Sequence, residues 1–145
     1  MKSFDRLLAL AQKLRGPEGC PWDQKQTLNS LMLKLGEECE EIQLALKKKD
    51  HENLKEEFGD TLFVLIMMLR IAQEQKLFTF SQVCQRIERK IISRHSWVFG
   101  AHQGKITTVS EIKKQWVRNK QLEKQRKAQR QAAPGDKGKK RAKFE

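Results

Sequence analysis

Two long apolar helical patterns, separated by only a few polar residues, constrain this fold more than any other feature. The first spans about residues 28–46 and repeats every three or four positions, through Leu28, Leu31, Met32, Leu35, Cys39, Ile42 and Leu46. The second runs from about 52 to 75. The connection Lys47–His51 allows only a tight reversal. The sequence therefore predicts an antiparallel helical hairpin.

Shorter patterns of the same spacing predict further helices over residues 4–14, 81–93 and from 109 onward. Side-chain caps are expected at Ser3, at Thr27 or Asn29, and at Thr79 or Ser81. The segment 16–23 contains two glycines and two prolines, which predicts a loop against which Trp22 packs. No stretch alternates as a strand would. We expect an all-α fold, a bundle of four to five helices.

The second hairpin helix is apolar nearly all round between Leu62 and Leu69, a pattern typical of burial on every face. A chain of 145 residues has few elements to cover it. We therefore expect a homo-oligomer, a dimer or a tetramer, formed through this helix. The longest apolar run, residues 61–69, is about half the ~20 residues that cross a bilayer, so no membrane span is expected.

The formal net charge of +12 is concentrated near the end of the chain. Residues 118–145 carry eleven Lys and Arg against three acids, a net +8. We expect a domain over 1–120 and a basic tail over 121–145 that is largely disordered, beyond about residue 131. The N-terminal segment lacks a secretory core, and the three cysteines are scattered. Both observations favour a cytoplasmic location.

Four carboxylates in the hairpin carry the strongest chemical signal. Glu38 and Glu41 share one helix face, as do Glu57 and Asp60. Glu41 and Glu57 each lie eight residues from Lys49 in the turn, and Glu38 and Asp60 each lie eleven residues from it. An antiparallel hairpin would bring all four to one level. Glu38 also falls within the apolar stripe, an unusual position for a solvated acid.

Four converging acids require raised pKa values or bound cations. Ligation by oxygen alone favours Mg²⁺, with Mn²⁺ as a substitute, over zinc or copper. The alternative is a solvated acidic face balanced by neighbouring lysines. The match of two pairs across one turn favours the metal site.

The motifs Glu37-Glu38-x-x-Glu41 and Glu57-x-x-Asp60 resemble those of the MazG family of nucleotide pyrophosphohydrolases, part of the all-α NTP pyrophosphatase superfamily. Further matches follow in order from residue 4 to 120: Gly19–Asp23 with Gln26-Thr27, Glu52–Leu54, Lys90 with Arg94-His95, Val98–Gly100, and Trp116 with Lys120. Leu28 and Ser96-Trp97 depart from the family pattern of His and Pro-His at those positions.

The resemblance implies an enzyme that hydrolyses a nucleoside triphosphate between the α and β phosphates, releasing a monophosphate and pyrophosphate. This would clear surplus nucleotides from the pool. Mg²⁺ would be held by Glu38, Glu41, Glu57 and Asp60. Glu37 would accept a proton from the attacking water or help to hold a further metal, which makes Glu37 and Glu38 the catalytic candidates.

The same resemblance implies that Lys34, Lys90 and Arg94 bind phosphate, that Asn53 contacts the nucleotide and that Trp116 stacks near the base. Lys90 and Arg94 as solvated positions, and Trp116 as a plain packing anchor, remain alternatives. A second hypothesis is a non-catalytic helical module that binds nucleic acid weakly through its basic tail.

Overall fold

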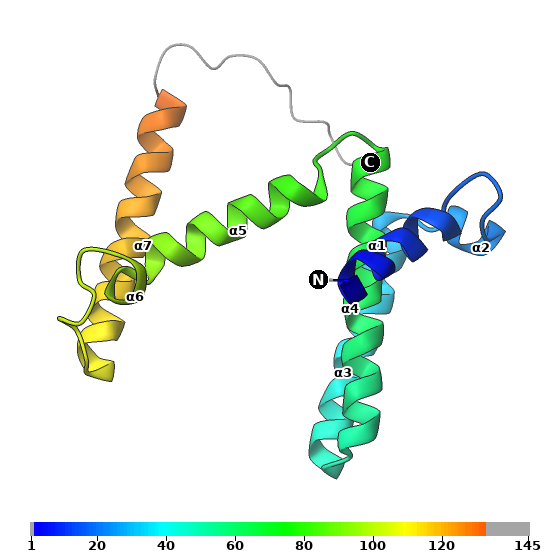
Figure 1. The fold of residues 1–145 in the computed structure, drawn as a ribbon, viewed down its shortest axis with the longest axis horizontal. Coiled ribbons are helices and arrows are strands. Elements are labelled where there is room, and N and C mark those ends of the chain that lie inside the picture. The colour runs from blue at the N-terminus through cyan, green and yellow to red at the C-terminus, as the bar shows by residue number, and fades with distance from the viewer. Residues whose placement is uncertain (1, 133–145) are drawn as a thin grey trace. The chain divides into compact units, whose positions relative to one another are not determined.

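The computed structural model describes residues 2–132, the last three by their backbone alone. This range is all-α and contains no strand, as predicted (Figure 1). Five long helices match the expected number, and two helices of four residues join them. In order they are α1 Lys2–Leu14, α2 Pro21–Gln24, α3 Leu28–Lys48, α4 His51–Glu74, α5 Phe80–Arg94, α6 Ser96–Phe99 and α7 Val109–Ala132.

The chain divides after Cys84, within α5, into two compact units. The expected domain over 1–120 and tail over 121–145 stay a prediction. Residues 121–132 belong to α7, so that helix ends close to residue 131, beyond which disorder is expected. The rest of the predicted tail, residues 133–145, lies outside the described residues.

The hairpin of α3 and α4 forms the body of the first unit, and the two helices run side by side (Figure 1). Its turn is as short as the sequence predicts. Lys49 adopts a left-handed conformation with φ 56° that ends α3. Asp50 then caps α4, because its carboxylate accepts a hydrogen bond from the Asn53 backbone N–H at 3.1 Å. The connection therefore fixes the register of the two helices.

The core of the first unit lies where α1 packs against the hairpin. Its buried residues come from α1, α3 and α4: Ala11, Leu31, Val64, Ile66, Met67 and Ile71. Arg15 directly follows the last residue of α1 and bonds to three groups of the first unit. Its guanidinium contacts Glu74 at 2.7 Å and donates to the backbone carbonyls of Asp23 at 2.5 Å and Gln26 at 3.3 Å. These bonds tie α1 and the loop after it to the end of α4.

Several local predictions need correction. Ser3 lies inside α1, where its hydroxyl accepts from Arg6 rather than capping the helix. Trp22 lies in α2 rather than in a loop and is 65% exposed, so it does not pack down. Met32, Cys39 and Leu46 of the predicted α3 stripe are also exposed. The cap predicted at Thr27 is confirmed, and together with Ser30 it forms a capping box at the start of α3.

The residue directly before each of α5 and α7 caps the helix. Thr79 caps α5 through the backbone N–H of Gln82, as predicted. Thr108 caps α7, and the Glu111 carboxylate accepts the Thr108 N–H in return. This reciprocal pair is a capping box that the sequence displays. None of the helices in the described range is both long and apolar enough to cross a membrane.

Candidate functional site

Three of the four predicted carboxylates converge between α3 and α4. Glu38, Glu41 and Glu57 each offer an oxygen, and these oxygens lie within 4.8 Å of one another. The equal distances of Glu41 and Glu57 from the turn explain why they meet. Asp60 is not part of this group. It is exposed, and its charge raises the pKa of Glu57 less than the charges of Glu41 and Glu38 do.

Glu38 is the most deeply placed member, with only 4% of its surface exposed. Its Oε1 contacts Lys34 Nζ at 3.0 Å, one helical turn away. Its buried Oε2 has no hydrogen-bond partner among the described residues. A carboxylate oxygen held dry without a donor is costly, at about 1–3 kcal/mol. A cation between the carboxylates would satisfy it.

Glu57 is also buried, and burial together with the nearby Glu41 carboxylate raises its pKa. Like charges confined at this distance favour protonation or a counter-ion. The residues present thus fit a hard divalent cation, because they supply several oxygens and no sulfur or imidazole.

Lys34 and Glu37 lie at the exposed edge of this cluster. Lys34 Nζ contacts Glu37 at 3.3 Å as well as Glu38, and these two carboxylates raise the pKa of Lys34. The lysine therefore screens the acids from one side. Asn53 is half-buried in the first turn of α4, where Asp50 caps its backbone N–H. No described contact ties its side chain to the cluster.

The remaining predicted residues belong to the second unit. Arg94 contacts Glu123 at 2.8 Å and lies over the Trp116 ring at 5.5 Å from its centroid. His95 meets the same ring edge-on at 5.2 Å. Trp116 is thus half-buried and packs against residues of its own unit, as a packing anchor would. Lys90 is half-buried on α5.

Sequence reasoning missed two residues that organise this unit. Glu123 accepts from both Lys127 and Arg94, which hold the pKa of its carboxyl at about 2. Asn119 is buried, and its amide donates to the Arg94 carbonyl and to Ser96 Oγ, each at 3.0 Å. Their helical spacing from Trp116 on α7, at +3 and +7, was the available signal.

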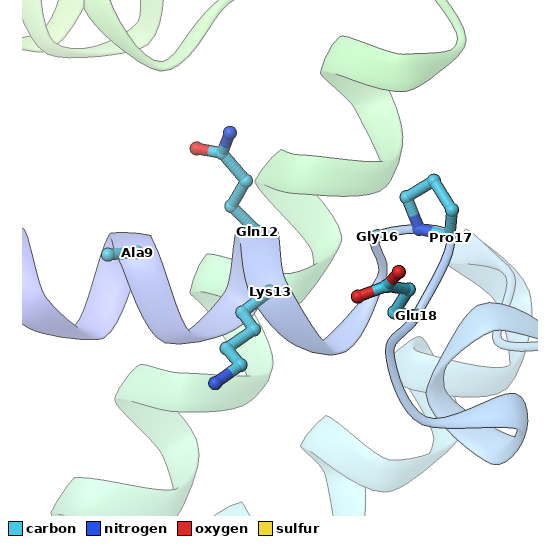
Figure 2. Close-up of a pocket in the computed structure, with 6 residues that line it drawn as sticks. All are labelled: Ala9, Gln12, Lys13, Gly16, Pro17 and Glu18. Carbon is cyan, nitrogen blue, oxygen red and sulfur yellow. The ribbon is translucent and has the colours of Figure 1, made fainter.

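A surface hollow elsewhere in the first unit holds none of the candidate residues. It is lined by α1 and the loop that follows, as Figure 2 shows: Ala9, Gln12, Lys13, Gly16, Pro17 and Glu18. The hollow is widely open and presents no convergent polar groups. The carboxylate cluster is therefore the stronger candidate for chemistry in this unit.

Fold and site together define the class: an all-α protein whose helical hairpin gathers carboxylates able to hold a divalent cation. A family model described as the MazG nucleotide pyrophosphohydrolase domain matches residues 26–99, the segment that contains the hairpin. The chain belongs to this family, which confirms the resemblance seen in its motifs.

Two relatives illustrate the match. The chain is 43% identical over 101 residues to the nucleoside triphosphate pyrophosphohydrolase/pyrophosphatase MazG of Thermotoga maritima, which covers 70% of this chain and 40% of the relative. It is 37% identical over 133 residues to the nucleoside triphosphate pyrophosphohydrolase of Escherichia coli, covering 91% and 50%. The chain thus spans half or less of the length of these relatives.

A solved structure extends the comparison to the fold. The crystal structure of a mazG-related protein from Thermotoga maritima superposes with a TM-score of 0.71 at 31% sequence identity. The match covers 81% of this chain and 98% of that one. The all-α architecture is therefore shared with a protein of similar size.

Proposed function

We propose that this chain is a Mg²⁺-dependent hydrolase that cleaves nucleoside triphosphates between the α and β phosphates, giving a monophosphate and pyrophosphate. The convergence of Glu38, Glu41 and Glu57, with one buried oxygen lacking a partner, carries the proposal. The names of the relatives support the same chemistry. Its role would be to clear surplus nucleotides in the cytoplasm.

In this proposal Glu38, Glu41 and Glu57 hold Mg²⁺, with Mn²⁺ as a substitute, and Asp60 joins them from the next turn of α4. The bound ion would neutralise phosphate charge and polarise the scissile bond. Glu37 is exposed beside the cluster, where it would accept the proton of the attacking water.

The cations and the remaining contacts follow the family resemblance. Lys34 already contacts two carboxylates and would exchange one of them for a phosphate oxygen. Lys90 and Arg94 would bind further phosphate oxygens, Asn53 would contact the nucleotide, and Trp116 would support the base. The Arg94–Glu123 ion pair would orient the guanidinium for this task.

The test is a panel of ribo- and deoxyribonucleoside triphosphates with Mg²⁺, scored separately for pyrophosphate and orthophosphate. The wild-type protein should release pyrophosphate, and Glu38→Gln and Asp60→Asn should each abolish its release. Glu40→Gln is the matched control, since Glu40 is an exposed acid outside the cluster. Orthophosphate as the product, or activity retained in both site variants, would refute the assignment.

We also propose that the protein acts as a homodimer or homotetramer assembled through α4. Phe58, Leu62 and Leu65 follow helical spacing on this helix and are 56%, 38% and 42% exposed. Contiguous exposed apolar side chains of this size favour a partner. Light scattering should give a mass above one chain, and Leu62→Lys with Leu65→Lys should reduce it to a monomer.

A further inference from the structure

The outer surface of α7 carries a row of basic side chains that the proposed hydrolysis does not use. At about 100° per residue, four exposed lysines of this helix project within an arc of about 60°. We call this row the lysine stripe: Lys113, Lys120, Lys124 and Lys127. It extends over fifteen residues, whose fourteen steps span about 21 Å along the helix axis.

The two described acids of α7 lie away from this arc and are already engaged. Glu111 accepts from Thr108 at the start of the helix. Glu123 accepts from Arg94 and Lys127. The stripe therefore presents positive charge that local carboxylates offset only at Lys127.

We propose that the lysine stripe binds the phosphate backbone of duplex DNA without reading its sequence. This goes beyond the hydrolysis and does not depend on it. Duplex DNA carries a charge about every 1.7 Å, so a row of about 21 Å faces several phosphates at once. Lysine is a mobile point charge, suited to phosphates rather than to base edges. The wide major groove of DNA also accepts a helix, whereas that of duplex RNA does not.

Two other polyanions fit the surface less well. A helix that lies on a membrane needs large apolar residues opposite its basic face. The face of α7 opposite the stripe carries the polar residues Glu111, Arg118 and Gln129, and Leu122 is the single large apolar side chain among them. Single-stranded nucleic acid needs exposed aromatic rings for stacking. The one aromatic residue of α7 is Trp116, which His95 and Arg94 already cover.

The test is fluorescence anisotropy of the full chain with a 20-base-pair duplex DNA of arbitrary sequence, at about 50–200 mM NaCl. The stripe variant combines Lys113→Gln with Lys124→Gln. Lys120 is kept because it lies in the family motif. The control combines Lys25→Gln with Lys48→Gln, two exposed lysines of the first unit with the same change in charge. A further variant, Lys113→Arg with Lys124→Arg, keeps the charge of the stripe.

We expect the wild-type protein to bind, with log Kd rising linearly with log salt. Loss of two phosphate contacts should lower that slope by about 1.8 in the stripe variant. Over a fourfold range of salt, its affinity should then fall about tenfold less than that of the wild type. The control and the arginine variant should keep the wild-type slope.

Three results would overturn the proposal. One is absence of wild-type binding at 50 mM salt. Another is a stripe variant whose slope equals that of the control. The third is binding to duplex RNA, or to vesicles of phosphatidylserine and phosphatidylcholine, at least as strong as binding to DNA. Unchanged helicity by circular dichroism ensures that a lost slope reports charge rather than unfolding.

Discussion

Replacing Glu38 with Met should make the metal-free protein more stable while abolishing its proposed activity. Glu38 is 4% exposed, and one of its oxygens is buried without a partner. Met has a similar length and no charge, so it fills the same space without an unsatisfied atom. Lys34, which would lose this carboxylate, is 44% exposed and keeps Glu37 at 3.3 Å.

The size of the effect follows from these environments. Removing the orphaned buried oxygen recovers about 1–3 kcal/mol. Hydration of the exposed Lys34 ammonium makes the loss of its ion pair a minor term. The free energy of unfolding should therefore rise by about 1–3 kcal/mol, which moves a urea midpoint upward by about 0.5–1.5 M.

The assay is urea unfolding followed by circular dichroism in EDTA and again in Mg²⁺. Wild type should gain about 2.7 kcal/mol when Mg²⁺ is present at one hundred times its Kd, and Glu38→Met should gain nothing. Glu40→Met, on the exposed face of the same helix, should change stability by less than about 0.5 kcal/mol. A Glu38→Met protein less stable than wild type in EDTA would refute the reasoning.

Three further predictions concern charged groups. Burial and Glu41 raise the pKa of Glu57, so the stability of the metal-free protein should fall as pH rises above 4.5. The stabilisation by Mg²⁺ should grow over the same range. In thermal melts at pH 5–8, Glu57→Gln should lose both dependences. Arg15→Ala should lower the free energy of unfolding by about 2 kcal/mol in urea titrations, since a mostly buried guanidinium leaves several acceptors unpaired. The pKa of about 2 keeps the Glu123 carboxylate charged, so its ion pairs with Arg94 and Lys127 persist above pH 4.5 and are lost as pH falls toward 2. The NMR signal of Arg94 Nε–H should report this loss. Loss of that signal already at pH 5 would contradict the assignment.

The hairpin could be predicted because its causes are local. Apolar residues at three-and-four spacing define the buried faces of α3 and α4, and a polar connection of a few residues permits only reversal. The burial of Glu38 followed from its place among Leu35 and Ile42. The exposure of Trp22 could not be predicted from the sequence. The same residues can form a loop that packs the ring down or a four-residue helix that leaves the ring in solvent.

Composition alone does not determine where the C-terminal helix ends. Residues 121–132 have few apolar side chains, which is typical of disorder. They are helical because α7 starts from a capping box at Thr108 and carries the Glu123–Lys127 ion pair one turn apart. The division after Cys84 was not predictable either, since it depends on which helices pack together rather than on any break in the sequence.

The length of the turn at Lys49 determines more than the reversal of the chain. Glu38 and Glu41 precede it and Glu57 follows it, so an inserted residue that displaces α4 by one helical position would rotate the α4 carboxylate by about 100° and shift it by about 1.5 Å relative to the others. Loops usually tolerate insertions. This connection should tolerate none, and chains of this family that keep the carboxylates should also keep the number of residues between them.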